Sequence, residues 1–359
     1  MTHLLNFQQA IADSEQFSKR HLLLGNGFSI ACRADIFHYE SLFNEADFSE
    51  APELISVFDA LGTQDFEIAI RSLENGAKLL PIYSEYGASA AKQMLTHAEL
   101  LKDILLQTIA GNHPEGPFDI DEEKFLACRK FLNYFIGTDA PKGCYVFTLN
   151  YDLLLYWSLM NEIVEGEGDS IMLNRNDGFD NDEDSPDADY VVWQGETGAH
   201  KPNYYFLHGA LHLFDSGSEL QKYTWIRSGE RLIEQARDAV SDDKFPLFVA
   251  EGTSKQKKNK IRHNAYLYQG YKVLTANAEQ AKHCFFIFGH SLAVNDDHIL
   301  KRLARGKFKK LYIGLHGSPD SEANVEIIAR ANSLAAMRKE KFPLEISFFD
   351  TQTANVWGA

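Results

Sequence analysis

Cysteine is scarce in this sequence, and its spacing excludes two kinds of site. The 359 residues contain four cysteines, Cys32, Cys128, Cys144 and Cys284, and no two of them form a Cys-x-x-Cys pair. A zinc ribbon needs such pairs, and a disulfide framework is typical of short secreted chains rich in cysteine. We therefore expect four buried thiols in a reducing compartment, with no zinc and no other bound metal.

The sequence also lacks long apolar runs and an excess of basic residues. No apolar stretch approaches the roughly 20 residues that span a bilayer, and residues 1–16 include acids but no apolar core of a signal peptide. Asp and Glu outnumber Lys and Arg by 51 to 35, which gives a net charge of −16 and disfavours binding to nucleic acids or anionic membranes. These absences predict a soluble, cytoplasmic protein.

One basic run, KQKKNKIR at residues 255–262, stands out from this acidic background. It has two interpretations: contact with the phosphates of a nucleic acid or cofactor, or a solvated loop. The acidity of the remaining chain favours the solvated loop.

Seven short apolar runs recur along the chain, with helical patterns between several of them. The runs are HLLLG (21–25), CYVFTL (144–149), YYFLHG (204–209), PLFVAEG (246–252), CFFIFG (284–289), KLYIGLHG (310–317) and LEISFFD (344–350). Most are apolar at consecutive positions, which is typical of strands covered on both faces. Strands that alternate with helices predict an α/β fold, Rossmann-like and doubly wound, around a mainly parallel sheet.

Two stretches interrupt this alternation. Residues 53–136 contain helical periods but no convincing strand, and we expect a helical insertion packed beside the sheet. Residues 162–189 are rich in Asp, Glu, Asn and Gly, a composition that predicts an acidic surface loop. Residues 1–52 and 137–359 would then form the Rossmann domain, with the acidic loop inside it.

The first polar signal is a glycine turn, Gly25-Asn26-Gly27-Phe28-Ser29, at the end of the first predicted strand. Glycines at this position let the backbone turn sharply and approach a phosphate. The full Gly-x-Gly-x-x-Gly pattern is absent, because Ile30 stands where the third glycine would fall. A tight turn without a ligand explains the segment equally well.

Polar residues close the second strand of the Rossmann core, in Thr148-Leu149-Asn150-Tyr151-Asp152. In open α/β folds ligands bind at this carboxyl edge of the sheet. The alternative is helix capping, because Asn and Asp commonly accept hydrogen bonds from the first turn of a following helix. Capping explains Asp152, but it does not explain why three polar side chains gather here.

Two later strand ends carry further polar groups. His208-Gly209 follows an aromatic run, and a histidine with a near-neutral pKa suits a general base, although a buried core histidine is the alternative. His212 and His316 compete with it for this role. The second glycine turn opens the segment Phe288-Gly289-His290-Ser291-Leu292-Ala293-Val294-Asn295-Asp296-Asp297-His298, which suits the ribose or phosphate of a nucleotide or is a plain connection.

Taken in order, these four strand ends resemble the sirtuin-like NAD-binding superfamily. GNGFS resembles its first glycine turn, TLNYD its Thr-Gln-Asn-Ile-Asp segment, LHG its catalytic His-Gly, and GHSLAV its Gly-Thr-Ser-Leu-x-Val. The chain resembles most closely the bacterial sirtuin-like proteins of anti-phage defence, which hydrolyse NAD. The resemblance implies an NAD glycohydrolase that releases nicotinamide and ADP-ribose.

The resemblance also implies a role for each residue. Asn150, Asp152 and His208 would be catalytic: Asn150 would position the nicotinamide-side ribose and a water, Asp152 would receive the carboxamide, and His208 would be the general base. The residues implied in holding NAD are Gly25, Asn26, Gly27, Phe28, Ser29, Thr148, Gly289 and Ser291. Asp35 and Phe37 would stand for the family's Pro-Asp-Phe-Arg loop, although its arginine is missing.

Two departures from the family bear on the reaction. The zinc ribbon of sirtuin deacylases is missing, and Leu149 replaces a glutamine beside the ribose. Both departures weaken protein deacylation and leave NAD cleavage standing. The alternatives are an NAD-dependent deacylase or ADP-ribosyltransferase, and a non-catalytic module that senses NAD or ADP-ribose. Because free NAD hydrolysis is toxic, the resemblance also implies control by homo-oligomerisation or by an activating partner protein.

Overall fold

The fold is built around one parallel sheet. The computed structural model describes residues 3–37, 39–83, 87–160, 164–165, 169–182, 187–195, 201–216, 219–224, 231–241, 246–249 and 253–358. Seven strands form the central sheet in the order β1 (Leu4–Leu5), β14 (Glu345–Asp350), β13 (Lys310–Leu315), β12 (His283–Phe288), β2 (Lys19–Leu24), β3 (Val146–Thr148) and β8 (Tyr204–Phe206). Every neighbouring pair in it is parallel.

The strand order identifies the architecture. From one edge to the other the strands run β8, β3, β2, β12, β13 and β14, so β2 and β12 are the neighbours from which the chain order runs outward in both directions. This is the order of the doubly wound Rossmann sheet, and β1 extends it beyond β14. The predicted fold class is therefore confirmed, and six of the seven apolar runs supply its strands.

Alternate residues of the strands face two different helix layers. On one face Phe286 of β12 stacks on Tyr312 of β13, with ring centroids 4.4 Å apart. Helices α1 (Phe7–Ser14) and α8 (Glu122–Ile136) cover this face, where Phe7 contacts Phe286 and Phe131. On the other face Tyr205 of β8 packs against Gly270 of α13 (Ala265–Ala278). Both faces are buried, as the consecutive apolar residues predict.

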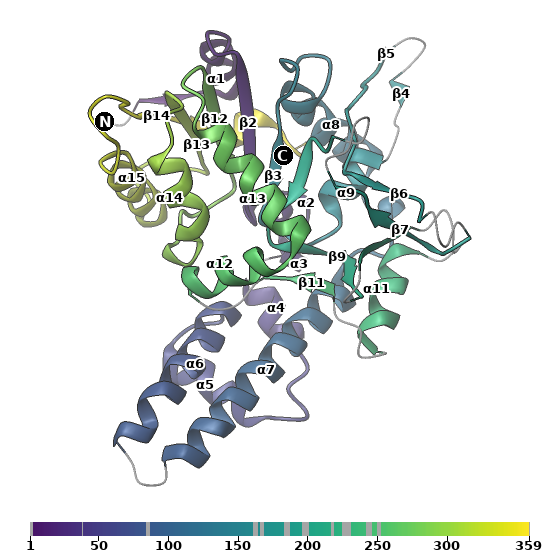
Figure 1. The fold of residues 1–359 in the computed structure, drawn as a ribbon, viewed down its shortest axis with the longest axis vertical. Helices are drawn as coiled ribbons and strands as arrows, with labels where there is room; N and C mark the ends of the chain where they lie inside the picture. Colours follow the sequence, from purple (N-terminus) through teal and green to yellow (C-terminus); the bar gives the residue numbers. More distant parts are fainter. Residues whose placement is uncertain are drawn as a thin grey trace.

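The region 53–136 is helical, as expected. It contains α5 (Glu53–Leu61), α6 (Phe66–Tyr83), α7 (Gly87–Asn112) and α8. Helices α6 and α7 form an antiparallel hairpin that projects away from the sheet (Figure 1), whereas α8 returns to cover the sheet. Between β2 and this region lie three short helices, α2 (Gly27–Cys32), α3 (Ala34–Phe37) and α4 (Tyr39–Glu45).

A second sheet, which the sequence did not predict, lies beside the first. Its order is β11 (Pro246–Phe248), β9 (Gly209–Asp215), β10 (Leu220–Tyr223), β7 (Tyr190–Trp193) and β6 (Phe179–Asp180), with antiparallel neighbours. The run 246–252 was expected in the parallel sheet, and this was wrong: β11 pairs with β9. Its apolar residues indicate burial but do not identify the neighbouring strand.

Only part of the predicted acidic loop, 162–189, lies within the described residues. That part includes three short strands. β4 (Val164–Glu165) and β5 (Asp169–Ser170) pair with each other, and β6 belongs to the second sheet. Asp177 is buried there and accepts hydrogen bonds from Lys222 Nζ at 2.5 Å and Tyr204 Oη at 3.0 Å. This acid is therefore an internal counter-ion. Residues 162–163, 166–168 and 183–186 lie outside the described residues.

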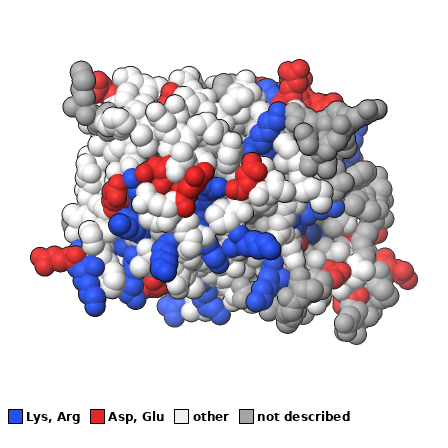
Figure 2. All heavy atoms as spheres, turned by 90° about the horizontal axis from the view of Figure 1, so that it is seen from above, with Lys and Arg blue, Asp and Glu red and all other residues white. Residues whose placement is uncertain are grey.

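Two further expectations concern membranes and thiols. In the described part of the chain, no helix combines the length and apolarity needed to cross a bilayer. All four cysteines are buried and free, as expected, and burial raises the pKa of Cys32 to about 12. Figure 2 shows Lys and Arg side chains beside Asp and Glu on one face, so the acidic net charge does not make every surface acidic.

The turn between β8 and β9 depends on Gly209. Its φ is +83°, and a Cβ there would overlap the carbonyl oxygen of Leu247. We expect Gly209→Ala to lower the free energy of unfolding by several kcal/mol, because it adds this overlap to the roughly 1–2 kcal/mol cost of a left-handed alanine. Gly62→Ala is the matched control, since Gly62 also has a positive φ but open space around it. Equal losses in urea unfolding would contradict the close approach.

Candidate functional site

A cavity of about 790 Å³ lies at the carboxyl ends of β2, β3 and β12 and beside the turn after β8. Eight of the eleven predicted site residues line it: Gly25, Asn26, Gly27, Asn150, Asp152, His208, Gly289 and Ser291. They come from four loops that are far apart in the sequence. The position between β2 and β12 is where the strand order reverses, which is where Rossmann folds bind their ligands.

The two glycine turns pack directly on each other. The amide of Gly27 donates to the carbonyl of Gly289 at 2.7 Å, and the amide of Gly25 donates to Phe288 at 3.0 Å. A Cβ on Gly27 would lie 2.6 Å from Gly289 Cα, and one on Gly25 would lie 2.7 Å from the Gly289 oxygen. Backbone contact between the turns therefore already requires these glycines, with or without a bound phosphate.

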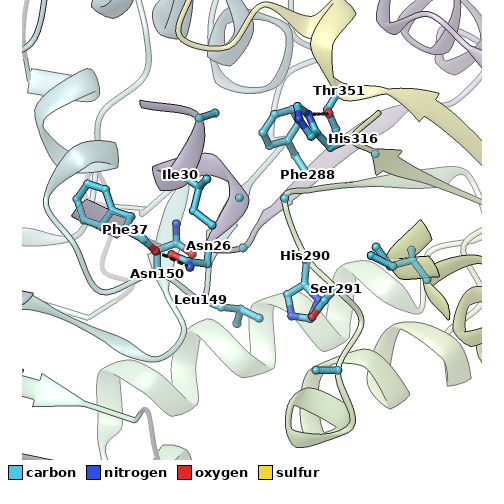
Figure 3. Close-up of a pocket in the computed structure, with 18 of the residues that line it drawn as sticks. Asn26, Ile30, Phe37, Leu149, Asn150, Phe288, His290, Ser291, His316 and Thr351 are labelled. Atoms are coloured by element: carbon cyan, nitrogen blue, oxygen red, sulfur yellow. Dashed lines mark hydrogen bonds between the residues drawn. The ribbon is translucent and has the colours of Figure 1, made fainter. Parts of the chain in front are cut away.

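The amides of the first turn are largely used within the chain. Besides Gly25 and Gly27, the amide of Phe28 donates to Gly25 and that of Ser29 to Asn26. The side chain of Asn26 donates to the carbonyl of Phe37 at 3.1 Å (Figure 3). The turn is thus a rigid floor of the cavity, and a pyrophosphate there would meet few open amides from this segment.

Ser29 links the two polar side chains that follow β3. Its hydroxyl donates to Asp152 Oδ2 and accepts from Asn150 Nδ2, the latter at 2.8 Å. Asp152 Oδ1 also accepts from the amide of Leu154 at 2.9 Å, at the start of α9 (Leu154–Met160). Both readings of the sequence therefore hold for Asp152: it caps a helix, and it lines the cavity.

Three predicted residues lie behind the cavity wall. Ser29 is completely buried between Asn150 and Asp152. Thr148 accepts from the amide of Asn150 through its hydroxyl at 3.0 Å, and Phe28 packs against Trp357 with ring centroids 5.2 Å apart. These three side chains support the residues that face the cavity.

His208 is buried at the cavity and faces a second histidine. Its Nε2 lies 3.0 Å from Nε2 of His298, and the two rings are stacked. Burial lowers the pKa of His208 well below its usual value, and it lowers that of His298 to about 4. Both rings are therefore neutral at physiological pH, and one hydrogen is shared between the facing nitrogens.

Asp296 lies close to this pair, with Oδ1 3.9 Å from His208 Nε2. Oδ1 also accepts from Lys257 Nζ at 3.2 Å, and Oδ2 accepts from His290 Nε2 at 3.1 Å. Burial raises the pKa of Asp296, but the His290 hydrogen bond and the Lys257 charge outweigh burial and hold this pKa well below its usual value. Asp296 is therefore a carboxylate inside the site.

Sequence analysis gave no role to four residues of this cluster. His290, Asp296 and His298 all lie in the segment that begins with the second glycine turn, but only Gly289 and Ser291 were assigned there. The sequence offered one signal for these residues, namely that Asp296, Asp297 and His298 follow one another shortly after the second glycine turn. Polar residues so close to an assigned turn indicate more than a connection.

The fourth missed residue comes from the basic run. Residues 255–262 were expected to form a solvated loop, but they belong to α12 (Ser254–His263). Lys257 and Ile261 are four residues apart on its buried face, while Lys260 and Arg262 are exposed. Lys257 reaches Asp296, so one cation of the run is internal. The expectation of a solvated loop was wrong for this residue because a helix has two faces.

The segment after the second glycine turn is held in an unusual conformation. Leu292 has a φ of +58° although it has a branched side chain, and its amide donates to His290 Nδ1 at 2.7 Å. This bond makes His290 Nδ1 an acceptor, so His290 donates to Asp296 through Nε2. Arg330 fixes the segment from outside, bonding the Leu292 carbonyl at 3.2 Å and pairing with Asp297. Strain of this kind is often found at functional sites.

The remaining candidate residues differ in whether they line the cavity. Phe37 lines the cavity, whereas Asp35 lies near the surface in an ion pair with Arg33. His212 is buried against Tyr156, outside the cavity, and His316 lines the far part of it near Thr351 (Figure 3). Among the three histidines weighed as general base, only His208 sits in the acid–histidine cluster.

The helical region contributes to the cavity wall. Leu42 of α4, Asp65 just before α6 and Ile109 of α7 line it, opposite the glycine turns and the strand ends. On the other side, Asn324 and Ile327 of α15 (Glu322–Ala335) and Gln352 complete the wall. The cavity is therefore bounded by the helical region as well as by the strand ends and α15.

The buried carboxyl of Asp152 predicts a pH-dependent stability. Burial raises its pKa from 3.8 to about 6, against the opposing hydrogen bond from Ser29. The folded chain therefore holds this proton more tightly than the unfolded chain, and its contribution to stability is lost as the pH rises from about 4 to 6. Relative to Asp152→Asn, the wild-type free energy of unfolding should fall by up to about 3 kcal/mol over this range.

The control for Asp152→Asn is Asp35→Asn. Arg33 lowers the pKa of the exposed Asp35. The free energy of unfolding of the wild type relative to Asp35→Asn should therefore change little with pH, and it should rise with pH where the Asp152 comparison falls. Urea unfolding from pH 4 to 7 measures both. A wild-type advantage over Asp152→Asn that grows with pH would show that the hydrogen bonds to Asp152 outweigh its burial.

Comparisons with known proteins give a family but no activity. A search of curated proteins finds no match to this chain. The model of the family described as "Domain of unknown function (DUF4917)" matches residues 22–357, which include every loop and helix named above as a cavity wall. Because the match covers nearly the whole sequence, the chain belongs to the DUF4917 family.

Proposed function

We propose that this chain is an NAD glycohydrolase, which binds NAD in the cavity and hydrolyses the bond between nicotinamide and ribose. The observation that carries the proposal is the convergence of Asn150, His208 and the two glycine turns on one cavity at the switch point of a Rossmann sheet. The resemblance in sequence concerned four separate motifs, and it requires that they meet at one cavity, as they do here. NAD would lie across the switch point, as dinucleotides do in this fold.

The chemistry needs little from the protein beyond orientation and one base. The bond between the ribose carbon and the pyridinium nitrogen breaks, its electron pair leaves with nicotinamide, and positive charge develops on the ribose. A water oxygen then bonds to that carbon, and its proton passes to His208. Neutral imidazole is the form that accepts a proton, and burial keeps His208 in this form.

The neighbours of His208 suit the charge that it would acquire. A proton on His208 makes an imidazolium, and the Asp296 carboxylate 3.9 Å away would stabilise it in a water-poor environment. His298 would share the proton through the facing nitrogen. Asp296 is thus a positioning residue in this proposal, while His208 touches the reacting water.

Asn150 would orient the water and the nicotinamide-side ribose. Its Nδ2 already donates to Ser29, which fixes the plane of the amide and leaves the carbonyl oxygen to accept from a water or a ribose hydroxyl. Asp152, on the other side of Ser29, would receive the nicotinamide carboxamide. A preorganised amide contributes most when it need not reorient as charge develops.

Substitution of the two catalytic residues tests the assignment. We expect His208→Ala and Asn150→Ala each to reduce the rate of NAD loss by about 10²–10⁴-fold, the usual contribution of a positioned base. The control is His263→Ala, at an exposed position on α12 away from the cavity. NAD loss is followed by chromatography, and circular dichroism checks that each variant folds. Parental rates in both His208→Ala and Asn150→Ala would refute the assignment.

Product analysis separates hydrolysis from the two related reactions. Incubation of the wild-type protein with NAD should release nicotinamide and free ADP-ribose in equal amounts. Transfer of ADP-ribose to protein would indicate an ADP-ribosyltransferase, and a requirement for acyl-lysine peptide would indicate a deacylase. Binding of NAD by calorimetry without any release of nicotinamide would identify a sensing module.

A further inference from the structure

The proposed base, His208, belongs to a cluster of three side chains that could also bind a metal ion. His208, Asp296 and His298 each present one ligand atom, two imidazole nitrogens and one carboxylate oxygen, and these three atoms lie within 4.8 Å of one another. Two of them come from one segment, since Asp296 ends a short 3-10 helix and His298 lies in the first turn of α14 (Asp297–Arg305). The third comes from the turn between the two sheets.

We propose that His208, Asp296 and His298 bind a divalent transition metal ion such as Zn²⁺ or Co²⁺. An ion about 2.1 Å from two imidazole nitrogens places them about 3.0 Å apart at right-angled geometry and about 3.4 Å apart at tetrahedral geometry. The observed separation of the facing Nε2 atoms is 3.0 Å. Asp296 Oδ1 is 3.9 Å from His208 Nε2, and a small rotation of its carboxylate would bring it to the same ion.

The ligand set and its surroundings favour this class of ion. Imidazoles with one carboxylate suit Zn²⁺ and its neighbours in the first transition series, whereas Mg²⁺ and Ca²⁺ prefer oxygen alone. His208 and Asp296 line the cavity, so an ion has an entry path and room for water as further ligands. His290 donates to Asp296 Oδ2, which is the outer hydrogen bond that orients a ligating carboxylate.

The positive charge of Lys257 should weaken metal binding, and this gives the test a second variant with an effect of opposite sign. Its buried ammonium already contacts Asp296 Oδ1 at 3.2 Å, and a second cation at the same oxygen adds like-charge repulsion. Removal of the Lys257 charge should therefore strengthen metal binding, whereas removal of any of the three ligands should weaken it. A structural cluster that binds no metal predicts neither effect.

The test is titration of the purified protein with Co²⁺, followed by its visible absorption, and with Zn²⁺, followed by calorimetry. We expect one ion per chain, at least tenfold weaker binding in His298→Ala and in Asp296→Asn, and tighter binding in Lys257→Met. His298→Asn is the conservative second variant if His298→Ala fails to fold. His263→Ala is the matched control and should bind as the wild type does. No binding, or equal binding in the wild type and all ligand variants, would overturn the proposal.

The effect of the bound metal on NAD loss gives a second test, which rests on the proposed function. An ion on His208 Nε2 occupies the lone pair that would accept the proton, so metal saturation should slow NAD loss at least tenfold and chelation by EDTA should restore it. Undiminished NAD loss in saturated protein would contradict His208 as the base and leave the metal site intact. Absence of binding with intact NAD cleavage would overturn the metal site alone.

Discussion

The contact between two backbone turns, one after β2 and the other after β12, is the constraint on which the site depends. The turns share a 2.7 Å hydrogen bond and leave no space for a Cβ at Gly25 or Gly27. Because they lie where the strand order reverses, this contact fixes the spacing between the loops on either side of the switch point. Asn150 and Asp152 are positioned from one side through Ser29, and the segment with Asp296 is positioned from the other.

Burial of charge is the second feature that organises the site. Asp296 occupies the N-cap position of α14 but does not cap the helix, because its side chain turns inward to Lys257 and His290. A carboxylate removed from water is tolerated only when it is paired and hydrogen-bonded. A conventional cap would stabilise α14 by about 1 kcal/mol. The inward orientation of Asp296 gives up this stabilisation of the helix, and the carboxylate instead contacts Lys257 and His290 in the site.

The sequence predicted the fold and the location of the site better than it predicted the contacts. Consecutive apolar residues indicated six strands of the central sheet, and polar residues at strand ends indicated the cavity, because parallel strands end at a common edge. The second sheet was missed since the partner of β11 is set by the turn at Gly209, not by its own residues. Ser29, Phe28 and Thr148 were placed in the right segments but support the wall, a distinction that depends on which side chain faces inward.

The histidine and lysine partners were missed for a different reason. Lys257 has no local pattern that marks it as internal, and the acidic composition favoured a solvated basic run. The polar residues after the second glycine turn indicated a site, but they did not indicate that His298 faces His208. Only packing of α12 and α14 on the same loop brings Lys257, Asp296 and His298 together. Contacts between helices that are distant in sequence are a property of tertiary structure, which periodicity alone does not determine.

The same helix also joins the site to the projecting hairpin. At the start of α12, Gln256 completes a capping box with Thr253 and donates through Nε2 to Glu74 of α6 at 2.7 Å, while Lys102 of α7 reaches the other oxygen of Glu74 at 3.3 Å. The next residue, Lys257, contacts Asp296. Adjacent residues of one rigid helix therefore contact the hairpin and the buried carboxylate. Because Asp65 and Ile109 from the same region line the cavity, the hairpin is part of the enclosure of the site as well as a projection from it.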